Sequence, residues 1–250
     1  MSAEKAQAIV LRTVEFSETS LVATLFTREF GKVRGLAKGA RRLKGPFDNA
    51  LDLLAACRIV FLRKSSGGLD LFTEARLERR FRPAGRSLAS LYAAYYVGEL
   101  LEALTDEHDP HPELFDTALE TLAGLSAGEP VGPRLLRFEL TGLGWLGHLP
   151  SLEQCVECGR PVEATPRVAF SLQAGGVLCA RCRPGKKQVV SVSRAVLEAM
   201  ARFADAESNR WQRAELEQRT RGELRAVLNH YLANLLGRPP RMHAWLGEGA

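Results

Sequence analysis

Short runs of alternating apolar and polar residues fill the first third of the chain and predict β-strands. Five runs rich in Val, Ile, Leu, Phe and Thr lie between residues 8 and 77, separated by turn-forming segments. The runs read AIVLRTV, SLVATLFT, GKVRGLA, LDLLAACRIVFL and LDLFTEARL. Five strands in so short a segment predict a small closed barrel, because closure leaves no exposed sheet edge. We favour the OB-type barrel, which binds oligonucleotides, over an SH3-like barrel with much the same pattern.

Helical spacing of the apolar residues replaces this alternation after residue 82. The spacing predicts helices over 88–104, 114–122 and 133–144. Pro112 then falls in the first turn of the second helix. Helical spacing resumes behind Ser193, a suitable N-cap, and a long helix is predicted from Leu216 to Gly237. These segments predict a helical bundle.

The sequence therefore predicts a multidomain α+β protein. Its fold class is an amino-terminal five-stranded OB-type β-barrel followed by a helical domain that carries a four-cysteine zinc module. The predicted divisions are a DNA-binding barrel over 1–82, a first helical part over 83–150, the zinc module over 151–190 and a second helical part over 191–250.

Four cysteines form the most specific motif in the chain. Cys155, Cys158, Cys179 and Cys182 read CxxC, twenty residues, CxxC, which is the spacing of a zinc ribbon or knuckle. Four thiolates fill a tetrahedral zinc shell and leave no position for water or substrate, so one structural Zn²⁺ is predicted. Two unrelated pairs or a redox dithiol are the alternative interpretation.

Several basic residues lie close to these cysteines in the sequence. They either balance the negative charge of the thiolates or contact nucleic acid, and the first interpretation is favoured. They are Arg160, Arg167, Arg181, Arg183, Lys186 and Lys187. The fifth cysteine, Cys57, lies in an apolar run and is predicted to be a buried thiol.

Composition is that of a globular protein, with 46% hydrophobic and 25% charged residues among 250. No apolar run reaches the 18 or more residues that a membrane span requires, and the start of the chain does not resemble a signal peptide. We therefore expect a cytoplasmic protein without membrane contact.

Positive charge is concentrated near the amino terminus. The net charge of the chain is +5, but residues 1–82 carry +7 and the remainder −2, which points to a polyanionic partner, with nucleic acid before an acidic membrane surface. The stretch GKVRGLAKGARRLKG holds six basic residues and four glycines without an acid. Glycines let the backbone approach phosphates, so this stretch is predicted to bind nucleic-acid backbones without reading sequence. A solvated surface loop is the alternative. Phe30 and Phe47 flank the stretch and are predicted core residues rather than base-stacking rings.

Motifs for catalysis are missing from the sequence. It contains no GxxxxGK[ST] phosphate loop, no HExxH and no GxSxG, so an enzyme is not expected. The segment DEHDPH, with Asp106, His108, Asp109 and His111, is interpreted as a polar connection between helices rather than a metal site.

Three segments together resemble the RecO family of recombination and DNA-repair proteins. They read AIVLRTVEFSETSLVATLFTREFGKVRGLAKGARR, RLLRFELTGLGWLGHLPSLEQCVECGR and FSLQAGGVLCARC. The resemblance implies an OB domain, a helical domain and a zinc module whose metal supports the fold. It also implies a non-enzymatic protein associated with the nucleoid. Such a protein binds single- and double-stranded DNA and anneals complementary strands. With RecR, it helps RecA to replace single-strand-binding protein.

The resemblance assigns DNA contacts to the basic residues of the matching motif. These are Lys32, Arg34, Lys38, Arg41 and Arg42, with Arg28 and Lys44 as neighbouring candidates. The competing hypothesis is a protein-interaction scaffold whose basic surface binds acidic peptides. Under the family resemblance, the candidate contacts for the acidic tail of single-strand-binding protein are Arg213, Arg219, Arg221 and Arg225, although a solvated helix face is favoured.

Overall fold

The computed structural model of the protein describes residues 3–42, 45–47, 50–64, 68–163 and 165–246. Within them the chain forms two compact units. The first unit comprises the residues up to Leu135 and those from Ala244 onward, and the second comprises Leu136–His243.

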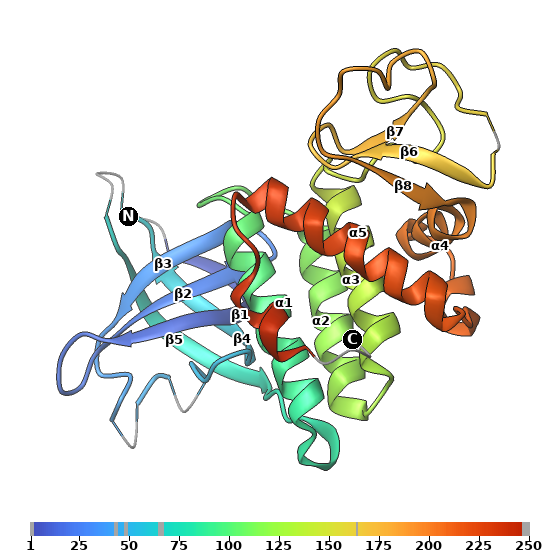
Figure 1. The fold of residues 1–250 in the computed structure, drawn as a ribbon. Helices are drawn as coiled ribbons and strands as arrows, with labels where there is room; N and C mark the ends of the chain where they lie inside the picture. Colours follow the sequence, from blue (N-terminus) through green and yellow to red (C-terminus); the bar gives the residue numbers. More distant parts are fainter. Residues whose placement is uncertain (1–2, 43–44, 48–49, 65–67, 164, 247–250) are drawn as a thin grey trace. The chain divides into compact units, whose positions relative to one another are not determined.

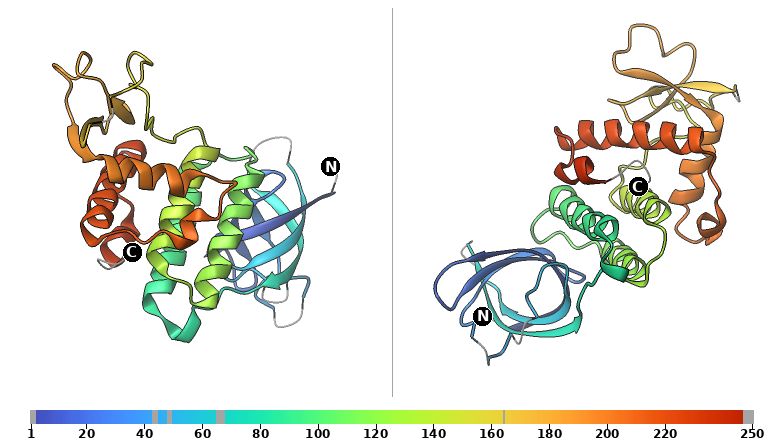
Figure 2. Two further views of the ribbon diagram at one scale, coloured as in Figure 1. Left: turned by 90° about the vertical axis from the view of Figure 1, so that its right-hand side faces the viewer. Right: turned by 60° about the horizontal axis from the view of Figure 1, so that its bottom comes forward.

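A closed five-stranded barrel forms the first part of unit 1 (Figures 1 and 2). Its strands are β1 (Ala3–Glu15), β2 (Leu21–Thr27), β3 (Gly31–Ala37), β4 (Ala56–Leu62) and β5 (Asp70–Arg79). They close in the order β1-β2-β3-β5-β4, and every pair is antiparallel except β3 with β5. Strand β1 pairs with β4 through its first half and with β2 through its second half. The closed five-stranded barrel predicted from the alternating pattern is confirmed, and its OB type stays a prediction.

Small and aromatic side chains fill the interior of the barrel. Phe61 and Phe72 are almost fully buried there, and Phe30 packs edge-on against Phe61 with ring centroids 5.4 Å apart. Phe47 also joins this core, as predicted from the sequence. Cys57 is buried among these residues, and burial raises the pKa of its thiol to about 12. The prediction of a buried thiol is confirmed.

A β-bulge at Leu11 decides which side chains of β1 reach the surface. Val10 pairs with Leu25 on β2, but the next paired residue is Arg12, opposite Thr24. Since side chains alternate along a strand, one inserted residue moves everything beyond it to the other face. Val10 therefore points into the core, whereas Arg12, two residues later, is exposed.

Two helices pack against each other and against the barrel in unit 1. They are α1 (Leu88–Leu104) and α2 (Pro112–Ala127), which contact β1 and β2, respectively. Ser87 caps α1 by accepting a hydrogen bond from the Ser90 N–H, and Pro112 lies in the first turn of α2 as predicted. The ring of Phe26 on β2 lies 6.1 Å from that of Phe115 on α2.

The connection between these helices approaches the barrel closely at Gly31. A Cβ atom built on Gly31 would lie 2.0 Å from the carbonyl oxygen of Asp109, and the φ angle of Gly31 is +65°. Only glycine fits this backbone conformation and contact. In the described part of the chain the acidic and histidine residues of this connection do not form a metal-ligand cluster. Its interpretation as a polar connection rather than a metal site stays a prediction.

Unit 2 combines a small sheet with helices. Helix α3 (Val131–Trp145) begins in unit 1 and continues into unit 2. The other elements of unit 2 are β6 (Arg167–Ser171), β7 (Gly176–Leu178), β8 (Val189–Ser193), α4 (Arg194–Ala204) and α5 (Gln218–Leu236). The strands form an antiparallel sheet in the order β7-β6-β8 (Figure 1), which the sequence pattern did not predict. Short 3₁₀ helices cover Ala84–Arg86, Arg210–Arg213 and Arg241–Trp245.

Sheet and helices share one apolar core in unit 2. Val168, Phe170 and Val192 from the sheet pack with Phe203 of α4 and Leu228 of α5. Helix α5 begins at Gln218, two residues after Leu216, the predicted start. It ends as predicted at Gly237, which adopts a left-handed conformation with φ +69°.

Ser193 occupies the N-cap position of α4, as predicted, but does not cap the helix with its side chain. Its hydroxyl donates instead to Glu223 of α5 at 2.7 Å, and its N–H donates to the same carboxylate at 3.1 Å. Arg167 of β6 donates to this carboxylate at 2.7 Å. Glu223 thus links β6, the start of α4 and α5.

Replacing Glu223 by glutamine tests this link. Burial raises the pKa of Glu223, but its hydrogen bonds from Ser193 and Arg167 prevail, so the pKa is lowered. A lowered pKa contributes stability that is present above the unfolded-state pKa and lost as the pH falls through the folded-state pKa. We expect Glu223→Gln to lower the free energy of unfolding by about 1–3 kcal/mol at pH 7, and by less at pH 4.

Urea unfolding at both pH values measures this effect. The matched control is Glu215→Gln, since Glu215 is exposed and has no ion pair among the described contacts. An equal destabilisation of Glu223→Gln at pH 7 and pH 4 would contradict the electrostatic explanation.

Candidate nucleic-acid interface and metal centre

The outer surface of β1, β2 and β3 carries two rows of side chains, which we call the β1–β3 face. One row crosses the strands through Arg12, Thr24 and Arg34, which are direct neighbours in the strand pairing. The second row is formed by Val14, Val22 and Leu36. Cationic and apolar side chains therefore lie next to each other on one sheet surface.

A groove of about 470 Å³ lies on this face. Lys32, Glu102 and Glu107 line its end beside α1. At its other end lies Phe16, which directly follows β1 and is 64% exposed. Strand faces of OB-type barrels and their adjoining loops bind oligonucleotides, so this groove is the candidate nucleic-acid interface.

Three predicted DNA contacts lie exposed at this interface. Arg34 projects from β3 into the groove lining, and Lys38 and Arg42 follow the end of β3. No ion pair involves any of the three among the residues that the structure describes. Their charges are therefore available to an anionic ligand.

Three other predicted contacts, Arg28, Arg41 and Lys32, have partners within the protein. Arg28 donates two hydrogen bonds of 2.9 Å to Asp116, which raise the pKa of the guanidinium. Arg41 pairs with Glu15 at 3.1 Å. The idea that the basic stretch lacks neutralising acids is thus wrong for Arg41, whose partner comes from a different strand. Lys44, the seventh candidate, lies outside the described residues.

The ammonium group of Lys32 is held by hydrogen bonds within the protein. Its Nζ donates to the carbonyl oxygens of Glu102 and Thr105 at 2.7 and 2.5 Å. These carbonyls lie at the carboxy-terminal end of α1, where a cation also offsets the negative end of the helix dipole. Of the predicted DNA contacts, Lys32 is accordingly less accessible than Arg34, Lys38 or Arg42.

Hydrogen bonds tie the β1–β2 turn to the basic segment after β3. The N–H of Arg41 donates to the carbonyl of Thr19 at 3.0 Å, in addition to the Arg41–Glu15 ion pair. Within the turn, the N–H of Phe16 donates to the carbonyl of Ser20 at 3.0 Å. Phe16 and the basic segment are thus held on the same side of the barrel.

Sequence reasoning missed Arg12 and Phe16. Alternation along AIVLRTV does not reveal Arg12 as a neighbour of Arg34, because the bulge at Leu11 changes the face. A signal for Phe16 did exist, since a large apolar residue inside the turn EFSETS lies outside the core pattern.

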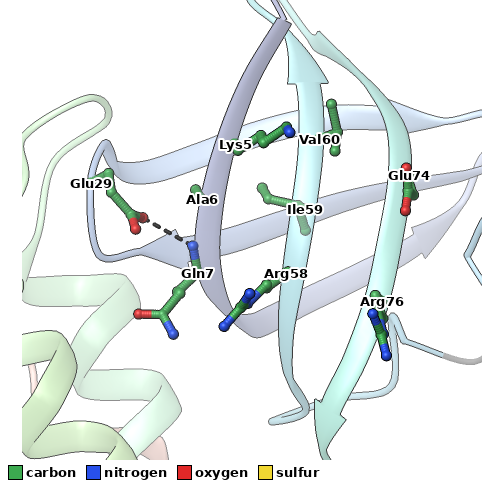
Figure 3. Close-up of a pocket in the computed structure, with 9 residues that line it drawn as sticks. All are labelled: Lys5, Ala6, Gln7, Glu29, Arg58, Ile59, Val60, Glu74 and Arg76. Carbon is green, nitrogen blue, oxygen red and sulfur yellow. Dashed lines mark hydrogen bonds between the residues drawn. The ribbon is translucent and has the colours of Figure 1, made fainter.

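A second groove, of about 610 Å³, lies over β1, β4 and β5 (Figure 3). Lys5, Arg58 and Arg76 project into it beside Glu29 and Glu74. Arg58 additionally forms an ion pair of 2.5 Å with Glu78. Carboxylates accompany the cations in both grooves, but the β1–β3 face continues into the segment with Lys38 and Arg42, which form no ion pair among the described residues, so it suits a polyanion better.

The four cysteines of unit 2 converge as their spacing predicted. Their sulfur atoms all lie within 4.8 Å of one another, and the sulfurs of Cys158 and Cys179 are 3.9 Å apart. Tetrahedral ligands at zinc–sulfur distances of about 2.3 Å would be separated by about 3.8 Å. The cluster therefore has the composition and dimensions to hold one metal ion.

Tight turns position each cysteine pair. The N–H of Gly159 donates to the carbonyl of Cys155 at 2.8 Å in the first turn, and the N–H of Cys182 donates to that of Cys179 at 3.1 Å in the second. Gly159 has a φ of +68°, a conformation that favours glycine.

The thiols of the cluster differ in pKa. Burial raises the pKa of Cys155, but backbone hydrogen bonds to its sulfur prevail and lower the pKa to about 6. Hydrogen bonds with Cys179 and Cys158 raise the pKa of Cys182 to about 12. Four neighbouring thiolates repel one another, and a bound cation removes that penalty.

Two of the six basic residues near the cysteines have partners in unit 2. Lys186 pairs with Glu157 at 2.7 Å and Arg167 pairs with Glu223. The others are exposed: Arg160, Arg181, Arg183 and Lys187.

The four arginines that were predicted to contact an acidic tail do not all face outward. Arg225 points inward to the fully buried Glu139, at 2.7 Å, so α5 does not present all four arginines outward.

The chain matches both parts of one family of recombination proteins. Residues 1–81 match the family described as "Recombination protein O N terminal", and residues 85–243 match "Recombination protein O C terminal". These matches define a protein of the DNA recombination and repair class. The chain belongs to the RecO family, and the resemblance noted in the sequence is confirmed.

Curated relatives extend over nearly the full chain. A DNA repair protein RecO from Rhodopirellula baltica is 42% identical over 96% of this chain and 98% of its own length. Proteins of the same name from Anaeromyxobacter sp. (strain Fw109-5) and Myxococcus xanthus are 37% and 34% identical. The first covers 98% of this chain and 95% of itself, and the second 92% and 91%.

Among the described residues, none of the helices combines the length and the apolar character that crossing a membrane requires.

Proposed function

We propose that the protein is a non-enzymatic DNA-binding mediator of recombination and repair, in which the β1–β3 face holds the sugar-phosphate backbone. The observation that carries this proposal is the group of exposed cations Arg34, Lys38 and Arg42, which lack ion-pair partners in the described part of the chain. Arg12 extends this cationic surface across the bulge. Phosphate contacts of this kind provide affinity without sequence readout.

Family membership supports the wider role. We infer that the protein binds single- and double-stranded DNA and anneals complementary strands. With RecR, it assists the loading of RecA onto DNA covered by single-strand-binding protein. The four-cysteine cluster holds one structural Zn²⁺ in this proposal, because four thiolates saturate the metal and leave no position for a reactant. Its role is therefore to stabilise unit 2 and not to catalyse a reaction.

Salt dependence of binding tests the proposal on the wild-type protein. If Arg12, Arg34, Lys38 and Arg42 each neutralise one phosphate, log affinity for single-stranded DNA should fall with log salt concentration with a slope of about −3. Fluorescence anisotropy with a labelled oligonucleotide measures this slope. Annealing of two complementary strands, followed in parallel, should be accelerated without nucleotide.

Other outcomes favour the competing functions. A flat salt dependence without annealing, combined with partner proteins that stay bound after nuclease treatment, would favour an interaction scaffold for acidic peptides. Cleavage of labelled DNA in the presence of Mg²⁺ or Mn²⁺ would establish an enzyme and reject the mediator.

A further inference from the structure

Phe16 is placed in an unusual position for a phenylalanine. Its backbone is held by the hydrogen bond to Ser20, yet 64% of the residue is exposed. Exposure of Val14, two residues earlier on the same strand, is 46%. Phe16 and Val14 therefore place apolar surface directly beside the cations of the β1–β3 face.

The β1–β3 groove is lined by equal numbers of cationic and acidic side chains, in contrast to the exposed segment after β3 that holds Lys38 and Arg42. Arg12, Lys32 and Arg34 line it opposite Glu15, Glu102 and Glu107. Two of these six side chains already have other partners within the protein, since Lys32 donates to carbonyls of α1 and Glu15 pairs with Arg41. Arg12 and Arg34 therefore remain for phosphates, whereas Val14, Phe16 and Val22 form an apolar part of the groove that does not bind phosphate.

A nucleobase fits these surroundings better than a phosphate. Its flat face can stack on the exposed ring of Phe16, and Val14 and Val22 add apolar surface beside it. The volume of about 470 Å³ lies in the range of small-ligand pockets. Outside the groove, Lys38 and Arg42 remain exposed for neighbouring phosphates of the same strand.

We propose that Phe16 is a stacking platform for an unpaired base, so that the β1–β3 groove binds single-stranded in preference to double-stranded DNA. This inference rests on the proposed function, because it assumes that the surrounding cations hold the phosphates. In a duplex both faces of each base are stacked on neighbours, and the ring of Phe16 reaches none of them. Backbone contacts alone do not make this distinction.

Substitution of Phe16 separates stacking from charge. Base stacking on an aromatic residue contributes about 1–3 kcal/mol, so Phe16→Ala should weaken binding to single-stranded oligo(dT) by about 5- to 150-fold. Binding to a duplex of the same length should be unchanged, and so should the salt slope for both ligands, because no charge is removed. Phe16→Trp should retain the affinity of the wild type. Its added tryptophan fluorescence should be quenched by the single strand only.

The matched control is Leu53→Ala, which removes another exposed apolar side chain from the barrel region. Its affinity for both DNA ligands should equal that of the wild type. An unchanged affinity of Phe16→Ala for oligo(dT), or equal losses for single strand and duplex, overturns the stacking inference. Loss of an apolar protein partner, with DNA binding intact, overturns it as well and assigns Phe16 to a protein interface.

Failure of this inference differs from failure of the proposed function. If wild-type binding retains its salt slope of about −3 while Phe16→Ala binds normally, only the stacking role is rejected. If the wild type itself shows a flat salt dependence, the proposed DNA-binding function is rejected before Phe16 is considered.

Discussion

Replacing Cys155 by serine is expected to release the bound metal and to unfold the segment 151–190. Cys155 is only 1% exposed, so the serine hydroxyl would be a buried polar group without the metal that the thiolate binds. The binding free energy of structural zinc, about 10–16 kcal/mol in zinc-finger peptides, is also folding free energy. This is comparable with the entire stability of a typical domain, about 5–15 kcal/mol.

Unfolding should extend beyond the cysteine turns. Strands β6 and β8 contribute Phe170 and Val192 to the same core as Leu228 of α5, so the loss of the sheet uncovers one side of that core. We expect a much lower thermal midpoint for unit 2 and lost amide-exchange protection over 151–190. Salt-dependent DNA binding should persist, because the β1–β3 face belongs to unit 1.

Elemental analysis and hydrogen exchange measure these effects. Native protein should contain about one zinc per chain, and the Cys155→Ser variant none. Cys57→Ala serves as the control, since it removes a buried thiol from the barrel and should leave the metal content unchanged. Zinc retained by Cys155→Ser, or native protein without any metal, would refute the assignment.

Replacing Arg34, Lys38 and Arg42 together by alanine should have the second-largest effect. This effect is on DNA affinity and not on stability. At about −0.7 per phosphate, loss of three contacts should make the salt slope less steep by about 2. Affinity for single strands at 0.1 M salt should fall about 100-fold. All three side chains are exposed, so the thermal midpoint should remain close to that of the wild type.

A second triple variant provides a control of equal charge. Lys5, Arg58 and Arg76 lie on the same barrel but line the groove over β1, β4 and β5 (Figure 3). Their replacement by alanine removes the same net charge, and anisotropy titrations should show a much smaller loss of affinity. Equal losses for the two variants would mean that overall charge, and not the β1–β3 face, determines DNA binding.

Local sequence patterns were sufficient for the barrel and for the four cysteines that converge in unit 2. Alternation of apolar residues specifies the inner face of a strand, and a CxxC pair determines two ligands within one turn. The partners of Lys32 and Arg41 could not be predicted in this way. They come from α1 and β1, and contacts between distant segments depend on the tertiary fold rather than on local pattern.

Other differences have similar physical causes. Ser193 does occupy the predicted N-cap position, but a carboxylate thirty residues later competes for its hydroxyl. The bulge at Leu11 reverses the face of Arg12, and nothing in AIVLRTV marks the inserted residue. Strands β6 to β8 are three to five residues long, too short for a clear period to be recognised among the glycines and cysteines.

The close approach at Gly31 has a consequence for any attempt to isolate the barrel. Phe26 on β2 is fully buried and its ring lies 6.1 Å from that of Phe115. A fragment ending at residue 82 would therefore lose the cover of Phe26, the carbonyl partners of Lys32 and the neighbour of Gly31. Helices α1 and α2 cover one side of the barrel. A fragment that retains the native barrel should therefore extend through both of them.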